Sequence, residues 1–272
     1  MIDAPFKCVG GKGKMVERLR TFLPADYVGY AEPFLGGGAL FRALASTGDL
    51  QGKSVLLSDF GYGAAMTWQA IQQDAAEVQA RLDDAKRKYD AFEPAWRKHA
   101  YLTERTRWNR GEQSAARHIF LRNLAFNGLW RENQKGGFNV PWGRYVKLRV
   151  PNLLPLGEAL QGDVEVRHAG FQEVVPIVPP GWVLYIDPPY LQEFDMYTKE
   201  GFSLAMQVEL LQMCRAAKQR EVHVIYSNRY FKPMLDLLKT HWPEGTPHRA
   251  VISQTIAAKS TARGAVEELV VT

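Results

Sequence analysis

Short, continuous apolar runs recur toward both ends of the chain, and each is typical of a strand buried in a sheet. The first two lie at 28–34 and 54–60, and helical spacing at 39–47 separates them. A cluster of glycines precedes that helical stretch, and a further helix is predicted at 15–23. This strand–glycine turn–helix–strand order predicts the beginning of an α/β sheet.

The last third of the chain alternates in the same way. Apolar runs predict strands at 164–169, 182–187 and 222–228. Helical periodicity predicts helices at 203–220 and 231–240. The sheet therefore continues after a long interruption.

The middle of the chain has a different character. Residues 62–125 carry many charges, helical periodicity and few strand signals, and 127–145 is dense in Asn, Gly, Arg and aromatic residues. Asn-Gly and Gly-Gly pairs in that second stretch predict a loop or β-ribbon. We therefore predict one α/β domain formed by 1–60 and 148–272, with 61–147 inserted into it.

Composition adds limits to this picture. The 272 residues are 46% hydrophobic and 23% charged, and the formal net charge of +5 only weakly indicates a polyanionic partner. No apolar run approaches the ~20 residues that span a bilayer, and the N-terminus lacks a signal-peptide layout. The two cysteines, Cys8 and Cys214, form neither a disulfide framework nor a zinc site, and no residues have metal-ligand spacing. We expect a cytoplasmic protein that needs no membrane and no metal.

The strand at 182–187 ends on an unusual bracket, Asp187-Pro188-Pro189-Tyr190. An acid at the end of such a strand lies at the sheet edge where open α/β folds bind ligands. The two prolines fix the backbone, so the carboxylate and the tyrosine ring are held at a set spacing. This arrangement suits a planar ligand with an amino group, although the residues alone also fit a plain turn with a packed tyrosine.

Glycines and a second acid indicate a nucleoside ligand. Gly36, Gly37 and Gly38 stand between the first strand and the helix at 39–47, and Asp59 ends the next strand. Glycines allow close backbone approach to a ligand, and a strand-end acid can hold ribose hydroxyls. The earlier Gly-Lys-Gly-Lys segment is not a phosphate loop, because Cys8 and Met15 stand where the motif needs glycine and a hydroxyl.

Together these motifs resemble the Dam-type DNA adenine-N6 methyltransferases of the α arrangement. The resemblance covers nearly the whole chain in order: a Gly-Gly-Lys segment, a Glu-Pro-Phe-x-Gly-x-Gly motif, an acid after the second strand, a recognition insertion, Asp-Pro-Pro-Tyr, and a closing Glu-plus-apolar strand at 267–272. The most specific match is "FNGLWRENQKGGFNVPWGRY" at 126–145, which is similar to the hairpin of members that act on GATC. One departure is Cys8, which stands where the family has a tryptophan.

The resemblance implies a Rossmann-like class I methyltransferase sheet with a helical and β-hairpin target-recognition insertion. It implies methyl transfer from S-adenosyl-L-methionine to N6 of a flipped adenine in double-stranded DNA, by a protein that we expect to be monomeric. The implied catalytic residues are Asp187, Pro188, Pro189 and Tyr190. The implied cofactor-binding residues are Cys8, Lys12, Glu32, Pro33, Phe34, Gly36, Gly38, Asp59 and Asp187, with Lys12 near the methionine end.

Within the insertion, the resemblance assigns DNA contacts to Phe126, Asn127, Leu129, Arg131, Asn139, Pro141, Arg144 and Tyr145. Arg131 is the candidate for a bidentate guanine contact, and Leu129 for a thymine methyl. Phe126 or Asn127 would hold the space left by the flipped base. Phosphate contacts are expected from Arg144, Lys135, Lys147 and Arg149, while Trp130 and Trp142 are expected to pack inside the hairpin.

The residues leave alternatives open. The target could instead be cytosine N4 or adenine in RNA, although cytosine enzymes more often have Ser than Asp before Pro-Pro. A DNA-binding module that has lost catalysis is a further alternative, against which the intact Asp187, Tyr190 and glycine motif argue. Whether the protein serves a host chromosome, a phage or a restriction–modification system stays open, as does the exact recognition sequence.

Overall fold

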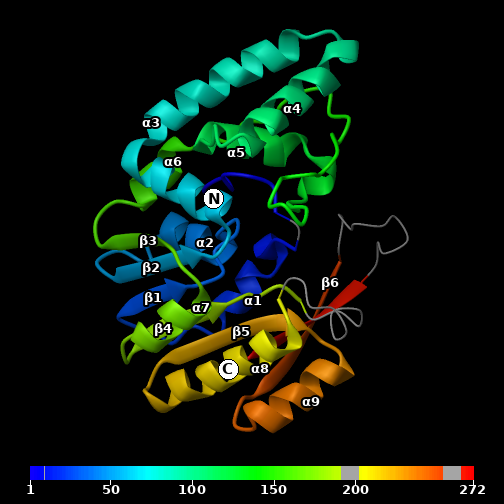
Figure 1. Cartoon of the computed structure of the whole chain (residues 1–272). Helices are drawn as coiled ribbons and strands as arrows, with labels where there is room; N and C mark the ends of the chain where they lie inside the picture. The colour runs from blue at the N-terminus through cyan, green and yellow to red at the C-terminus, as the bar shows by residue number, and fades with distance from the viewer. Residues whose placement is uncertain (9, 191–201, 254–264) are drawn as a thin grey trace.

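The computed structural model describes residues 1–8, 10–190, 202–253 and 265–272 (Figure 1). Within this part of the chain the helices and strands follow the order η1 Lys12–Lys14, α1 Val16–Arg20, β1 Gly29–Glu32, α2 Ala39–Thr47, β2 Ser54–Asp59, α3 Tyr62–Ala91, α4 Pro94–Asn109, α5 Ala115–Leu124, η2 Phe126–Gly128, α6 Leu154–Ala159, β3 Val164–His168, α7 Phe171–Val174, η3 Val175–Ile177, β4 Trp182–Ile186, α8 Leu204–Gln219, β5 His223–Arg229, α9 Lys232–His241, β6 Pro247–Ser253 and β7 Ala265–Val271. No helix in the described residues is long and apolar enough to cross a membrane.

The strands form one seven-stranded sheet in the order β3-β2-β1-β4-β5-β7-β6. The strands from β3 to β5 run parallel, whereas β7 pairs antiparallel with both β5 and β6. This mostly parallel sheet confirms the predicted α/β class and is consistent with a class I methyltransferase fold. The chain order reverses between β1 and β4, which places a ligand crevice at the carboxyl ends of those two strands.

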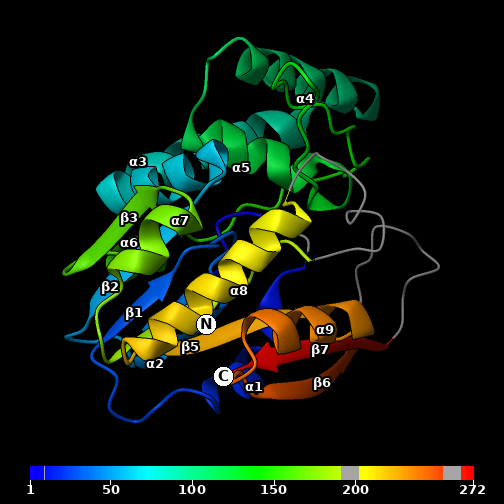
Figure 2. The same ribbon diagram turned by 60° about the horizontal axis from the view of Figure 1, so that its bottom comes forward.

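Two apolar layers enclose the sheet, which explains why its strands read as continuous apolar runs. Successive residues of β1 point to opposite faces, so Tyr30 belongs to one layer and Ala31 to the other. The first layer includes residues of α1, α2, α6 and the beginning of α3. The second includes residues of α7, α8 and α9, the last two lying side by side across the sheet in Figure 2.

The helix α3 connects the sheet to a second group of helices. It is broken at Asp74, whose backbone is not helical and whose side chain accepts a hydrogen bond from the Glu77 amide at 2.8 Å. Asp74 therefore caps the second half of α3 in the manner of an N-cap residue. Before the break Trp68 and Ile71 pack in the sheet-side core, whereas Tyr89 near the far end packs in a separate core with residues of α4 and α5. We call α4, α5, the far half of α3 and residues 125–150 the recognition lobe, after the target-recognition role expected from the family resemblance; it lies above the sheet in Figure 1.

The predicted loop or β-ribbon at 127–145 is an irregular hairpin. Its pairing is limited to isolated bridges between Glu132 and Phe138 and between Ala125 and Trp142. Amide hydrogen bonds from Asn133 to the Gly137 carbonyl and from Gly136 to the Asn133 carbonyl close its tip. The hairpin is held by packing instead of a long ladder, since the Trp130 ring stacks on Phe138 with centroids 4.1 Å apart.

Candidate functional site

A large cavity opens at the carboxyl ends of β1, β2 and β4, with a volume of about 1460 Å³. It is lined both by the glycine turn Gly36–Gly38 and by the bracket Asp187–Tyr190. These two motifs are separated by almost 150 residues in sequence, but the order of the strands brings them together. The volume exceeds the ~300–1,000 Å³ of a typical small-molecule pocket, so there is room for more than one ligand group.

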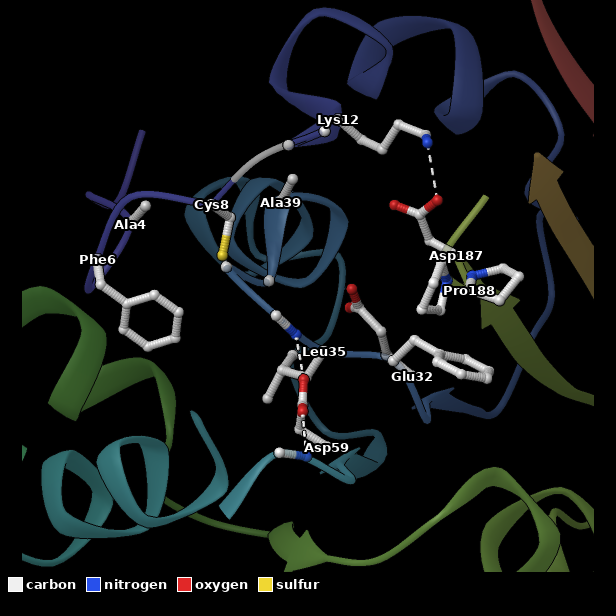
Figure 3. Close-up of a pocket in the computed structure, with 18 of the residues that line it drawn as sticks. Ala4, Phe6, Cys8, Lys12, Glu32, Leu35, Ala39, Asp59, Asp187 and Pro188 are labelled. Atoms are coloured by element: carbon white, nitrogen blue, oxygen red, sulfur yellow. Dashed lines mark hydrogen bonds and ion pairs between the residues drawn. The ribbon is translucent and has the colours of Figure 1, made fainter. Parts of the chain in front are cut away.

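Asp187 follows β4 and directs its carboxylate into this cavity (Figure 3). Its Oδ1 accepts a hydrogen bond from Lys12 Nζ at 2.7 Å and from Ser227 Oγ at 3.1 Å. Lys12 is only 3% exposed, which makes this a largely desolvated ion pair. The resemblance implies Lys12 near the methionine end of a cofactor, and the structure places its ammonium against Asp187.

Tyr190 shares the same cluster. Its phenol donates a hydrogen bond to Glu268 Oε2 and also contacts Lys12 Nζ. Burial raises the pKa of Tyr190 well above its usual value, and the nearby Asp187 and Glu268 raise it further. The phenol is therefore neutral at physiological pH and acts as a hydrogen-bond donor. Between Asp187 and Tyr190, Pro188 is buried and Pro189 exposed.

The glycine turn adopts backbone conformations that favour glycine. Gly36 and Gly38 have φ of 45° and 60°, and a Cβ on Gly38 would lie 2.6 Å from the Trp68 ring. The Trp68 indole nitrogen on α3 donates a hydrogen bond to the Gly36 carbonyl at 2.9 Å, which fixes the position of the turn. The turn therefore presents backbone instead of side chains to the cavity.

Asp59 holds the turn from the other side. Its two carboxylate oxygens accept hydrogen bonds from the Gly36 and Gly61 amides, each at 2.8 Å, as Figure 3 shows. Burial raises the pKa of Asp59, and these two amide hydrogen bonds oppose the rise. A carboxylate has about four lone-pair sites, so Asp59 keeps capacity for further donors from the cavity.

Glu32, at the end of β1, is the most deeply buried acid facing the cavity. It is 2% exposed and accepts a hydrogen bond from Tyr30 at 2.7 Å. Burial raises its pKa to about 8, and the nearby Asp187 adds to the rise, while hydrogen bonds from Tyr30 and the Phe41 amide oppose it. Pro33 and Phe34 follow it in the cavity wall, where the Phe34 ring packs 5.6 Å from Phe171.

Cys8 joins the cavity to the recognition lobe. Its sulfur lies close to the turn, 3.5 Å from where a Cβ on Gly37 would be, and accepts a hydrogen bond from Arg122 at 3.0 Å. The adjacent Lys7 donates to the Asn123 carbonyl at 2.8 Å and lies 3.6 Å from the centroid of the Tyr145 ring. The N-terminal segment thus contacts both the glycine turn and α5.

The predicted DNA-contact residues lie on the hairpin, outside the walls of the cavity. Arg131 is exposed and donates from Nε to Asn139 Oδ1 at 2.9 Å, which orients the guanidinium. Phe126 is 44% exposed, and its amide donates to the Pro141 carbonyl. Asn127 and Arg144 have positive φ, and Leu129 is half-buried. Lys135, Lys147 and Arg149 are exposed, and Arg149 also lines the cavity.

The two hairpin tryptophans pack internally. Trp130 lies against Phe138 and also 4.7 Å from the His118 ring, and Trp142 donates from its indole nitrogen to the Tyr89 phenol at 3.0 Å. Both contacts agree with the expectation that these rings serve packing.

Three residues of the site were not expected from the motifs. Phe60 follows Asp59, lines the cavity and is 79% exposed, an unusual state for a phenylalanine. Ser227 and Glu268 reach the Asp187 cluster from β5 and β7. The closing Glu-plus-apolar strand at 267–272 is a sequence signal for Glu268, although it does not say which glutamate enters the site, whereas Ser227 has no such signal. Among the described residues, no group of three or more His, Cys, Asp or Glu side chains could hold a metal ion.

Comparisons with known proteins agree with this geometry. The family model of the D12 class N6 adenine-specific DNA methyltransferases matches residues 9–252. A type II methyltransferase, M1.LlaDCHI of Lactococcus lactis subsp. cremoris, is 28% identical over 98% of this chain and 94% of its own length. The DNA adenine methylase of Vibrio cholerae is 30% identical over 82% of this chain and 79% of its own. That of Escherichia coli K12 is 24% identical over 97% and 92%.

Proposed function

We propose a residue-level mechanism for this chain, which belongs to the D12 class N6 adenine-specific DNA methyltransferases. The chain is a DNA methyltransferase that modifies N6 of adenine and requires a methyl donor. We infer that the donor is S-adenosyl-L-methionine, that the catalytic group is the Asp187–Tyr190 bracket, and that the target sequence is GATC. Double-stranded DNA is the proposed partner, bound by a monomer in the cytoplasm.

The fit of S-adenosylmethionine to the cavity rests on the glycine turn and its flanking acids. Gly36–Gly38 expose backbone to the cavity, Asp59 keeps acceptor capacity for ribose hydroxyls, and exposed Phe60 offers a face for a purine ring. The Asp187 carboxylate would favour a cationic ligand, and a bound cation would lower the pKa of the neighbouring Glu32 from its unliganded value of about 8. When bound, S-adenosylmethionine supplies an activated methyl group on a positively charged sulfur.

The Asp187–Tyr190 bracket would bind the target base. An adenine within a duplex is not accessible, so the base must leave the stack and enter the cavity. There the Asp187 carboxylate and the Pro188 carbonyl accept the two N6 hydrogens. These hydrogen bonds shift the nitrogen toward tetrahedral geometry, so that its lone pair is no longer delocalised into the ring. Tyr190 stacks on the base. The bracket would therefore act mainly by positioning the base and by electrostatic stabilisation.

The hairpin would read the sequence around that base. Arg131 is oriented through the hydrogen bond from its Nε to Asn139, and its terminal nitrogens would bind O6 and N7 of a guanine. Leu129 meets a thymine methyl, and exposed Phe126, with Asn127, supports the gap left by the extruded base. Pro141 and Tyr145 shape the base of the hairpin. We propose phosphate contacts for Arg144, Lys135, Lys147 and Arg149.

The observation that carries this proposal is the single cavity lined by both the glycine turn and the Asp187 bracket. The test is incubation of the pure protein with S-adenosylmethionine and unmethylated plasmid, followed by nucleoside chromatography and modification-sensitive sequencing. We expect N6-methyladenine confined to GATC.

A matched pair of variants tests Asp187 itself. Asp187→Ala should lower the methylation rate by roughly 100-fold or more, with DNA binding retained. Asp26→Ala, an exposed acid in the turn before β1, serves as the control and should match the wild type. Methylcytosine as the product, or an Asp187→Ala rate near that of the wild type, would contradict the proposal.

A further inference from the structure

Lys12 pairs with one oxygen of the carboxylate that is proposed to bind the adenine amine. Its ammonium is 2.7 Å from Asp187 Oδ1, a charge-assisted hydrogen bond, and Ser227 donates to the same oxygen. The ammonium also lies 4.3 Å from the centroid of the Tyr190 ring, the ring proposed to stack on the base. An entering adenine therefore meets a carboxylate whose negative charge is already compensated by a buried cation, which weakens the hydrogen bond that its amine can make to Asp187.

A second carboxylate lies within reach of the same ammonium. Glu268 Oε2 is 3.5 Å from Lys12 Nζ, and Glu268 is 2% exposed, whereas the Asp187 side chain is 20% exposed. A shift of about 0.7 Å would bring Nζ to the ~2.8 Å of a charge-assisted hydrogen bond with Glu268. Lys12 could then leave Asp187 without losing its counter-ion, which a buried charge cannot do cheaply.

Glu268 also holds the phenol of Tyr190. The Tyr190 hydroxyl donates to Glu268 and touches Lys12 Nζ, so the three side chains form one connected cluster. One carboxylate on β7 thus contacts both groups that surround the proposed position of the base.

We propose that Glu268 is a positioning residue that accepts the Lys12 ammonium when the target base enters, and so frees Asp187 to bind the adenine amine. The inference rests on the role proposed for Asp187. Without the Glu268 charge, Lys12 has only Asp187 as a counter-ion within the cluster, so the Asp187 charge stays compensated and the amine binds that carboxylate weakly.

The first test measures binding, with no methyl donor present. Two GATC duplexes are compared, one with adenine at the target and one with purine, which lacks the exocyclic amine. The wild type should prefer the adenine duplex by roughly tenfold, the worth of one hydrogen bond to a charged group. In Glu268→Gln this preference should fall to about twofold or less, because Lys12 stays on Asp187.

The second test is the single-turnover methylation rate at saturating DNA and donor. Glu268→Gln should lower it by roughly tenfold or more, with little change in DNA affinity, and Glu268→Asp, which keeps the charge, should recover most of the rate. Glu267→Gln is the matched control, because Glu267 lies next in the strand but pairs with Arg249 and is 39% exposed. It should behave as the wild type.

Tyr190→Phe separates the contact of Glu268 with Tyr190 from its contact with Lys12. It removes the tyrosine hydroxyl and keeps both the ring and the Glu268 carboxylate. If Tyr190→Phe loses as much amine preference as Glu268→Gln, Glu268 only anchors the tyrosine and the inference fails. It also fails if Glu268→Gln keeps the wild-type preference and rate. A wild type that makes no methyladenine would instead overturn the proposed function.

Discussion

Three acids at the ends of neighbouring strands differ in the hydrogen-bond donors that surround their carboxyl groups. Asp59, after β2, is held by two backbone amides. Asp187, after β4, is held by an ammonium and a hydroxyl. Glu32, at the end of β1, is buried next to Asp187, so its pKa rises to about 8 although a tyrosine hydroxyl and one amide donate hydrogen bonds to it. Position alone would have made the three residues equivalent.

Glu32 should make the stability of the unliganded protein depend on pH. Its pKa is about 4.5 in the unfolded chain and about 8 in the folded one, so folding takes up a proton between these values. Stability should therefore fall as pH rises from 4.5 toward 8, by up to about 1.4 kcal/mol per pH unit from this group. Urea unfolding of Glu32→Gln at several pH values should lack that part of the slope.

The control for this measurement is Glu17→Gln, which changes an exposed glutamate on α1. It should keep the wild-type slope. If Glu32→Gln and Glu17→Gln gave the same pH dependence, Glu32 would not carry its proton into the folded state.

At the scale of the element, α2 begins and ends on glycines with different constraints. Gly38 at its N-terminus has φ of 60° and lies against the Trp68 ring, whereas Gly48 at its C-terminus has φ of 79° and a Cβ there would meet only the Gln51 side chain, at 4.0 Å. The first glycine meets both a backbone and a packing requirement, and the second meets only a backbone requirement. The end of α2 that faces the cavity is thus the less tolerant one.

Gly38→Ala and Gly48→Ala should separate these two requirements. Gly48→Ala should cost about 1–2 kcal/mol of unfolding free energy, the penalty of a left-handed backbone, and leave donor binding unchanged. Gly38→Ala adds a steric conflict with Trp68, so it should be more destabilising and weaken S-adenosylmethionine binding by roughly tenfold or more. Urea unfolding and calorimetric titration measure the two effects. Equal donor affinities in the two variants would show that the glycine turn is not part of the donor site.

At the scale of the whole molecule, the two lobes share helices instead of meeting across a linker. The helix α3 contributes Trp68 to the sheet-side core and Tyr89 to the core of the recognition lobe. The helix α5 does the same with Ile119 and Phe120. The proposed insertion at 61–147 is therefore continuous with the domain that it interrupts.

This sharing predicts one cooperative unfolding transition. Phe120→Ala, in the recognition lobe, should lower the unfolding free energy by about 3–5 kcal/mol. The amides of β1 and β4 should lose protection from hydrogen exchange to the same extent. Hydrogen exchange of the amides of those strands is the measurement. Phe92→Ala, at an exposed phenylalanine in the same lobe, is the control. Unchanged protection of β1 and β4 in Phe120→Ala would mean that the lobes unfold independently.

Much of the fold follows from local patterns. The runs at 54–60, 182–187 and 222–228 became β2, β4 and β5, and the helices at 39–47, 203–220 and 231–240 became α2, α8 and α9. These segments were predictable because burial on both faces makes a strand continuously apolar, and because helices that cover a sheet are amphipathic. The edge strand β6 was missed, since it begins with Pro247 and is only partly apolar.

By itself, the sequence determined the sheet class, the glycine turn and the Asp187–Tyr190 bracket, because each depends on residues that are adjacent in the chain. Only the tertiary structure decided that Lys12, Asp187, Tyr190 and Glu268 form one buried cluster. These residues come from η1, the end of β4 and β7, and no local preference encodes the distance between them. The strand order sets that distance, and with it which buried charges become partners.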